Sequence, residues 1–154
     1  SMSTDSRRSP RLIDYLPLEV WVIHAVDHHP LAGPFAGRII DISTHGACLL
    51  MTQVLQQHVH VFHTTRSSDD LVLQLAINLD GEQATYLLTA RPVWLSAIRQ
   101  RRILAFKMGV EFTIDPDKEQ MRELRQALHA NQEQRANWWQ RHSHLLHPSQ
   151  SSSS

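Results

Sequence analysis

The stretch LVLQLAINL, residues Leu71–Leu79, decides the fold class of this chain. Its leucines and isoleucine alternate with Val, Gln, Ala and Asn at a period of two, the pattern of a β-strand with one strongly apolar face. Asp80-Gly81 follows directly and is a strong signal for a tight hairpin turn. The next segment, Ala84–Leu95, is therefore predicted to return as a partner strand, with Pro92 at an edge or bulge position.

Further strand-like segments lie on both sides of this hairpin. They are rich in β-branched, aromatic and other apolar residues, and turn-prone residues separate them. Several strands joined by short turns are typical of a small barrel or sandwich. The further strands are predicted at Leu18–Val26, Gly37–Ile42, Ala47–Met51 and Ile103–Phe112, with turns at His29–Gly33 and Arg99–Arg102.

An α-helix is predicted after the last strand. Asp115 is its expected N-cap, Pro116 occupies the first helical position and Asp117 complements the helix dipole. The apolar residues that follow at helical spacing form one face, which is expected to pack on the strands. These residues are Met121, Leu124 and Leu128.

The composition indicates one domain without a strong net electrostatic field. The chain has 154 residues, of which 42% are hydrophobic, enough for one core and too few for two. Fifteen basic residues balance fifteen acidic ones, so the chain as a whole does not attract a nucleic-acid polymer. A nucleic-acid-binding small barrel is for this reason the weakest of the functional hypotheses.

Cys48 is the single cysteine and lies in the apolar run Ala47–Met51. An intramolecular disulfide is impossible, and a buried thiol in a reducing compartment is expected. No stretch approaches the ~20 apolar residues that a membrane span needs. These features predict a cytoplasmic protein without a membrane span.

Two short motifs near the start of the chain combine opposite charges. Arg7-Arg8-Ser9-Pro10-Arg11 reads R-x-x-x-R, and Asp41–Gly46 (DISTHG) reads D-x-S-x-x-G. Arginine forks suit phosphates and the O6/N7 edge of guanine, whereas an ionised Asp41 accepts from the N1 and N2 hydrogens on guanine's other edge. The two motifs together predict a nucleotide-binding site.

The order and spacing of these motifs resemble the PilZ domain, a bacterial module that binds the second messenger cyclic di-GMP. Met108–Phe112 (MGVEF) resembles the closing strand of that family, and the segment from Asp115 resembles its terminal helix. The resemblance implies a mainly β fold, a small antiparallel β-barrel of six or seven strands with a C-terminal α-helix. It also implies cyclic di-GMP as ligand and no further cofactor.

The resemblance assigns ligand contacts to residues of both motifs. Arg7, Arg8 and Arg11 would bind the phosphates or the Hoogsteen edge of guanine, although a solvated basic terminus is their simpler interpretation. Asp41 would bind the Watson–Crick edge of guanine. The remaining implied contacts are a hydroxyl bond from Ser43, an amide of Gly46 that faces the ligand, and pocket lining by His45, which is equally compatible with an exposed turn.

Four parts are predicted along the chain. They are a flexible N-terminal arm at 1–15, the barrel with the start of the helix at 16–130, a helical extension at 131–147 and a disordered Ser-rich tail at 148–154. Trp138 and Trp139 form a second apolar patch in the extension. This patch either packs back onto the domain or forms an interface with a protein partner or a second copy of the chain.

Metal binding and catalysis are not predicted. The histidine clusters His58, His60 and His63, and His142, His144 and His147, lack a cysteine pair or an HExxH spacing, so surface histidines are expected. No nucleophile elbow or phosphate loop is present. Glu119 and Glu123 are expected to pair with Arg122 and nearby basic residues.

The resulting hypothesis is a cyclic di-GMP receptor that orders its arginine arm when the ligand binds and signals to a partner or a second subunit, with motility, biofilm, polysaccharide or virulence control as outputs. The alternative is a protein-interaction adaptor of pilus or flagellar machinery that does not depend on nucleotide. Retention of both motifs favours the receptor.

Overall fold

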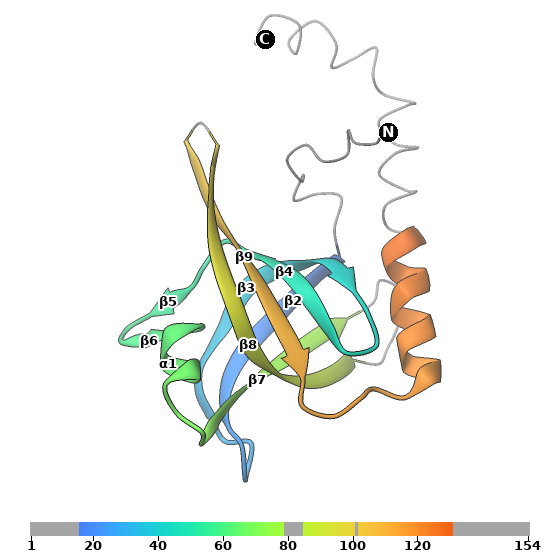
Figure 1. Cartoon of the computed structure of the whole chain (residues 1–154), viewed down its shortest axis with the longest axis horizontal. Helices are drawn as coiled ribbons and strands as arrows, with labels where there is room; N and C mark the ends of the chain where they lie inside the picture. Colours follow the sequence, from blue (N-terminus) through green and yellow to red (C-terminus); the bar gives the residue numbers. More distant parts are fainter. Residues whose placement is uncertain (1–15, 79–84, 101, 131–154) are drawn as a thin grey trace, which may run out of the picture.

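A closed six-stranded β-barrel forms the centre of the computed structural model, which describes residues 16–78, 85–100 and 102–130 (Figure 1). The order around the barrel is β2-β3-β4-β9-β8-β7, and all neighbours are antiparallel, including the β2–β7 pair that closes it. The predicted mainly β barrel is confirmed. Its strands are β2 (Leu16–His24), β3 (Pro30–Ile42), β4 (Gly46–Met51), β7 (Leu71–Asn78), β8 (Thr85–Gln100) and β9 (Ile103–Phe112).

The apolar face of β7 points into the barrel, as its period of two predicted. Each residue of this face is at most 6% exposed, and β2 and β8 flank the strand on its two sides. The predicted Asp80-Gly81 turn lies outside the described residues, as does Leu79. The buried residues of this face are Leu71, Leu73, Leu75 and Ile77.

The first hairpin reverses earlier than predicted. β2 ends at His24, and β3 begins at Pro30, inside the predicted turn His29–Gly33. The Asp27 carboxylate fixes the reversal by accepting a hydrogen bond from the His29 amide at 2.9 Å. Proline is tolerated at the start of β3 because its pairing with β2 is irregular there, with two register shifts.

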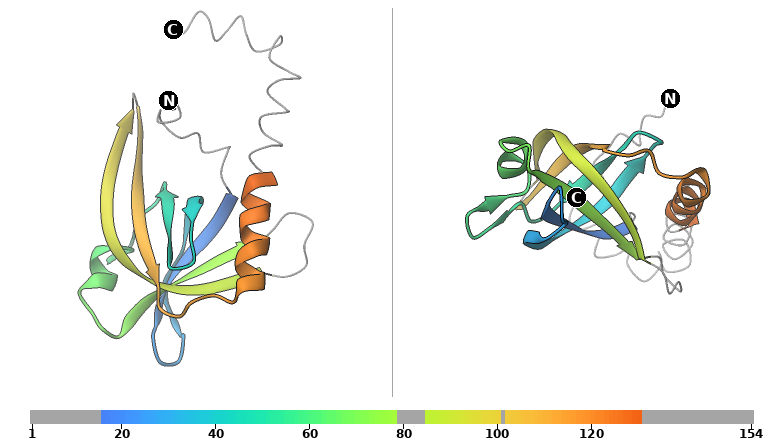
Figure 2. Two further views of the ribbon diagram at one scale, coloured as in Figure 1. Left: turned by 45° about the vertical axis from the view of Figure 1, so that its right-hand side comes forward. Right: turned by 90° about the horizontal axis from the view of Figure 1, so that it is seen from below.

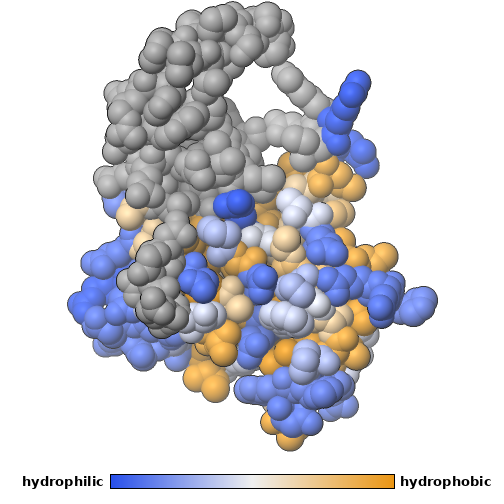
Figure 3. All heavy atoms as spheres, turned by 180° about the vertical axis from the view of Figure 1, so that it is seen from behind, coloured by the Kyte–Doolittle hydropathy of each residue, from blue (hydrophilic) through white to orange (hydrophobic). Residues whose placement is uncertain are grey.

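The β8–β9 hairpin is longer than predicted and projects beyond the barrel (Figures 1 and 2). β8 continues past Leu95 to Gln100, while β4 stops pairing with β9 at Phe106, so the end of the hairpin has only two strands. Arg99 and Arg102 are exposed near its tip. In the space-filling view, a hydrophilic tip stands above a hydrophobic surface on this projection (Figure 3).

The segment between β4 and β7 folds into small elements that the sequence did not predict. β5 (Leu55–Gln56) and β6 (Val59–His60) form a two-stranded sheet, and the one-turn helix α1 (His63–Arg66) follows. His60 joins them, because its Nδ1 accepts hydrogen bonds from the amides of Phe62 and His63 at 3.0 and 3.1 Å. Burial, and to a lesser extent His63, lowers the pKa of His60, which fits a neutral, accepting imidazole.

His58 and His63 are exposed, as predicted for surface histidines, whereas His60 is partly buried and has the structural role just given. Within the described ranges, no group of three or more His, Cys, Asp or Glu residues is arranged to hold a metal ion. The second predicted cluster, His142, His144 and His147, lies outside those ranges.

The C-terminal helix occupies residues 118–130 and lies beside the β3–β4 turn in all views (Figures 1 and 2). Its N-cap is Asp117 rather than the predicted Asp115, because Asp117 Oδ1 accepts the Gln120 amide hydrogen bond at 2.8 Å. Pro116 therefore precedes the helix. The predicted apolar face is confirmed, since Met121 and Leu124 belong to the buried core and Leu128 packs against it.

Candidate functional site

A β-bulge turns Asp41 away from the core. Ile39 pairs with Leu49, and both side chains are buried, but the register then slips by one residue so that Asp41 pairs with Cys48. In a regular strand Asp41 would share the inward face of Ile39, two residues earlier. The extra residue, Ile40, places the carboxylate on the exposed exterior instead. The local geometry of β3 is therefore what makes Asp41 available to a ligand.

The turn after Asp41 is closed by its own serine and glycine. The Ser43 amide donates to the Gly46 carbonyl oxygen at 2.8 Å, and Ser43 Oγ lies 3.3 Å from both the amide nitrogen and the carbonyl oxygen of Gly46. The Gly46 amide, to which the resemblance assigned a ligand contact, thus donates to Ser43 in this structure. Ser43 itself is exposed, and its two side-chain bonds are long, so the hydroxyl is available to a ligand.

Gly46 has a structural reason to be glycine. Its position in β4 pairs with Glu111 of β9, and a Cβ atom there would collide with the carbonyl oxygen of Val110. The last position of the D-x-S-x-x-G motif is therefore glycine because the backbone of strand β9 lies too close for a side chain. Gly46 shapes the turn that presents Asp41 and Ser43.

His45 lies at the tip of this turn and faces the segment between β9 and the helix. Its carbonyl oxygen accepts the Phe112 amide at 2.8 Å, and its Nδ1 is 3.5 Å from Asp115 Oδ1. Both side chains are largely exposed, so the contact contributes little to stability. The neighbour that the structure gives to His45 is thus Asp115, in the segment that leads from β9 to the helix.

A second bulge turns Trp94 outward on β8. Pro92 pairs with Val110 and faces the core, and after a register shift Trp94 pairs with Gly109 and is 44% exposed. Pro92 thus lies at a bulge, one of the two positions predicted for it. Trp94 was not predicted as a site residue, although the signal was present: a bulge at Pro92 inverts the alternation that follows and moves the indole to the exterior.

Asp41 and Trp94 belong to one row across four strands. Asp41 pairs with Cys48, Cys48 with Gly109, and Gly109 with Trp94, so all four positions share the exterior face. A Cβ atom on Gly109 would collide with the Trp94 indole. The indole therefore lies over Gly109 and extends from the Trp94 backbone toward Cys48. The row thus places an exposed aromatic face, a small partly buried thiol and an exposed carboxylate side by side.

Cys48 lies at the centre of the row and is partly buried. Burial raises the pKa of its thiol; the nearby Lys107 opposes this effect and the Asp41 carboxylate reinforces it. Cys48 has no disulfide partner. It is a neutral small side chain at neutral pH, and it leaves room above the sheet between Asp41 and Trp94.

The arginine motif joins the barrel beside Asp41. Arg7, Arg8 and Arg11 lie outside the described residues, but the first described residue, Leu16, pairs with Ile39, two positions from Asp41. Leu16 lies five positions after Arg11, a reach of about 17 Å when extended. The attachment point of the arm is therefore close enough for its arginines to meet a ligand on the row.

Trp138 and Trp139, the predicted partner interface, also lie outside the described residues. Among the helices that the structure describes, none is long and apolar enough to cross a membrane.

Comparison with protein-family models matched the PilZ domain over residues 5–130. The chain belongs to the PilZ domain family. The match contains the R-x-x-x-R arm, the D-x-S-x-x-G turn and the barrel, and it ends at residue 130, the last described residue of the helix. Comparison with curated proteins and with solved structures gave no match. The PilZ family comprises cyclic di-GMP receptor and adaptor domains rather than enzymes.

Proposed function

We propose that this PilZ protein is a receptor for cyclic di-GMP that holds the nucleotide between its arginine arm and the row from Asp41 to Trp94. The observation that carries the proposal is the bulge at Ile40, which exposes Asp41 on the barrel exterior next to the point where the arm joins. A bulge that re-aims one carboxylate is typical of a functional position.

Each group of the row suits one part of the nucleotide. Asp41 accepts from N1 and N2 of a guanine, and Ser43 donates to a base or a phosphate. The exposed face of Trp94 stacks on a purine base, an interaction that every base can make. Arg7, Arg8 and Arg11 bind the phosphates or a Hoogsteen edge through charge-assisted hydrogen bonds.

Ligand binding would order the N-terminal arginine arm. A short arginine-rich segment has few apolar side chains with which to fold alone, and a dianionic ligand supplies the opposite charge. The change at the arm is then transmitted to a protein partner or to a second copy of the chain, with Trp138 and Trp139 as the candidate contact surface and bacterial motility or biofilm formation as candidate outputs.

Calorimetric titration of the full chain with cyclic di-GMP tests the proposal. We expect micromolar or tighter binding for the wild type, loss of binding for Asp41→Ala, and wild-type binding for Asp69→Ala, an exposed carboxylate in the loop before β7. A folded wild-type protein that gives no heat and no spectral shift with the nucleotide would favour the nucleotide-independent adaptor instead.

A further inference from the structure

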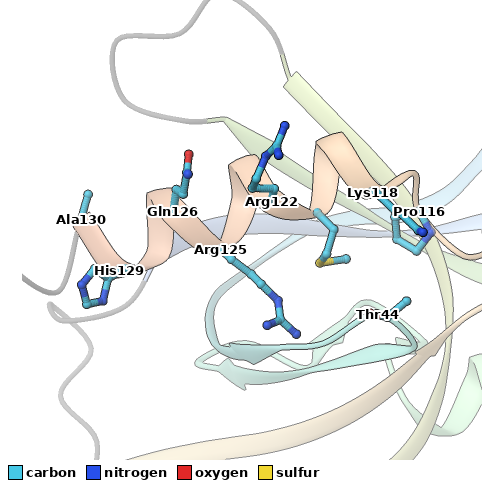
Figure 4. Close-up of a pocket in the computed structure, with 9 residues that line it drawn as sticks. Thr44, Pro116, Lys118, Arg122, Arg125, Gln126, His129 and Ala130 are labelled. Atoms are coloured by element: carbon cyan, nitrogen blue, oxygen red, sulfur yellow. The ribbon is translucent and has the colours of Figure 1, made fainter.

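A groove of about 560 Å³ lies on the helix side of the D-x-S-x-x-G turn, between Thr44 and the C-terminal helix (Figure 4). Three permanently charged side chains line it, Lys118, Arg122 and Arg125, and its lining contains no carboxylate. Figure 4 shows Arg125 reaching from the helix toward the β3–β4 hairpin, while Arg122 points to the other side of the helix. The groove is thus a positively charged hollow beside the D-x-S-x-x-G turn.

The acidic residues near the groove already have partners. Glu119 forms an ion pair with Arg122, and Glu123 accepts a hydrogen bond from the Tyr86 hydroxyl. Asp117 caps the helix. Asp115, as described above, lies next to His45. The Glu119 ion pair compensates Arg122, so the uncompensated charges of the groove are those of Lys118 and Arg125.

Arg125 and Lys118 are the two cations that this arrangement leaves open. Within the part of the chain that the structure describes, neither side chain has a hydrogen-bond or ion-pair partner, and both are exposed. A guanidinium presents a planar fork of donors that matches two oxygens of a phosphate, and an ammonium adds a compact point charge. The Thr44 side chain supplies a hydroxyl donor on the opposite wall.

We propose that this groove is an anion site that takes a phosphate group through Arg125, Lys118 and Thr44. The phosphate belongs either to cyclic di-GMP bound at the turn or to a separate phosphorylated metabolite, and the recognising chemistry is the same for both. The site does not depend on the receptor function proposed above. It makes the C-terminal helix a direct contact of the anion.

The test uses inorganic pyrophosphate as the probe and the full chain in amide-resolved NMR. We expect saturable shifts of the Thr44, Lys118 and Arg125 amides. The Arg125→Gln variant should weaken the apparent affinity about tenfold or more, because one charge-assisted pair is lost. Arg99→Gln, which removes an exposed cation near the remote hairpin tip, should bind pyrophosphate like the wild type.

The result that overturns the site is the absence of saturable shifts at these amides, or equal affinity in Arg125→Gln and the wild type. Cyclic di-GMP added to the pyrophosphate complex then distinguishes the two sources. Displacement of pyrophosphate identifies the groove anion as a phosphate of the nucleotide, and simultaneous binding identifies a separate phosphorylated ligand. Because pyrophosphate binding is measured alone first, a protein that fails to bind the nucleotide still gives a result for the groove.

Discussion

Asp41 and Trp94 occupy the same cross-strand row on the exterior of the barrel, and each reaches that face through its own β-bulge. Three strand-to-strand steps separate their backbones, about 14 Å, and the Trp94 indole covers part of this span by lying across Gly109. The barrel therefore presents an exposed carboxylate and an exposed aromatic ring on one surface.

Removal of the Trp94 ring should weaken cyclic di-GMP binding. Trp94→Ala is expected to cost about 1–3 kcal/mol of binding free energy, a roughly 5- to 150-fold loss, because base stacking is lost. Trp94→Phe should retain part of the affinity. Leu87→Ala, which removes an exposed apolar side chain from another part of β8, is the matched control and should bind normally. Equal affinities for Trp94→Ala and the wild type, by calorimetry, would remove Trp94 from the site.

Cys48 should report on the occupancy of the row. Its raised pKa predicts slow alkylation by iodoacetamide at neutral pH and a rate that climbs as pH increases. Asp41→Asn should speed the reaction, because the carboxylate contributes to raising the pKa of the thiol. Saturating cyclic di-GMP should slow it by covering the sulfur. An alkylation rate unchanged by bound nucleotide, followed by mass spectrometry, would show that the ligand lies elsewhere.

Substitution of Gly46 should lower the free energy of unfolding. Gly46→Ala places a Cβ against the Val110 carbonyl oxygen, and we expect a loss of about 1–3 kcal/mol in the free energy of unfolding. Ser43→Ala should lose less, about 0.5–1.5 kcal/mol, because it removes only the long hydrogen bonds of an exposed turn. Urea unfolding monitored by tryptophan fluorescence checks both values. Wild-type stability in Gly46→Ala would mean that β9 does not approach the turn this closely.

His60 should make stability dependent on pH. Its pKa is lowered in the folded protein, so the unfolded chain binds protons more readily, and the stability is complete above the unfolded pKa of about 6.5 and decreases as pH falls below it. Urea unfolding of the wild type and of His60→Gln between about pH 5 and 8 measures this effect. The variant should be less stable at neutral pH and should have the shallower pH dependence. Identical pH slopes would show that His60 is not neutral and accepting in the folded state.

Local patterns were sufficient to predict most of the barrel. The alternation in Leu71–Leu79 identified β7, and the helical spacing of Met121 and Leu124 identified the buried helix face. The missing amide proton of Pro92 predicted an edge or bulge position, and the structure has the bulge. These features depend on residues that are neighbours in the sequence, so a sequence reading can recover them.

Features that depend on partner strands were not predictable in the same way. The exposure of Asp41 arises from a register slip against Cys48, and the need for Gly46 arises from the Val110 backbone of a distant strand. The place of Trp94 in the row with Asp41 follows from its pairing with Gly109, which the sequence does not show. The one-turn helix α1 was missed because the hydrogen bonds to His60 that support it involve a side chain rather than a periodic pattern.

The most direct test of the central claim is a calorimetric titration of cyclic di-GMP, with stoichiometry, into the wild type, Arg11→Ala and Arg99→Ala. If the arm and the row from Asp41 to Trp94 form one site, the wild type and Arg99→Ala bind with the same micromolar or tighter affinity, and Arg11→Ala loses at least about tenfold. Equal binding by Arg11→Ala and the wild type would contradict the account, because the arm would then not belong to the site.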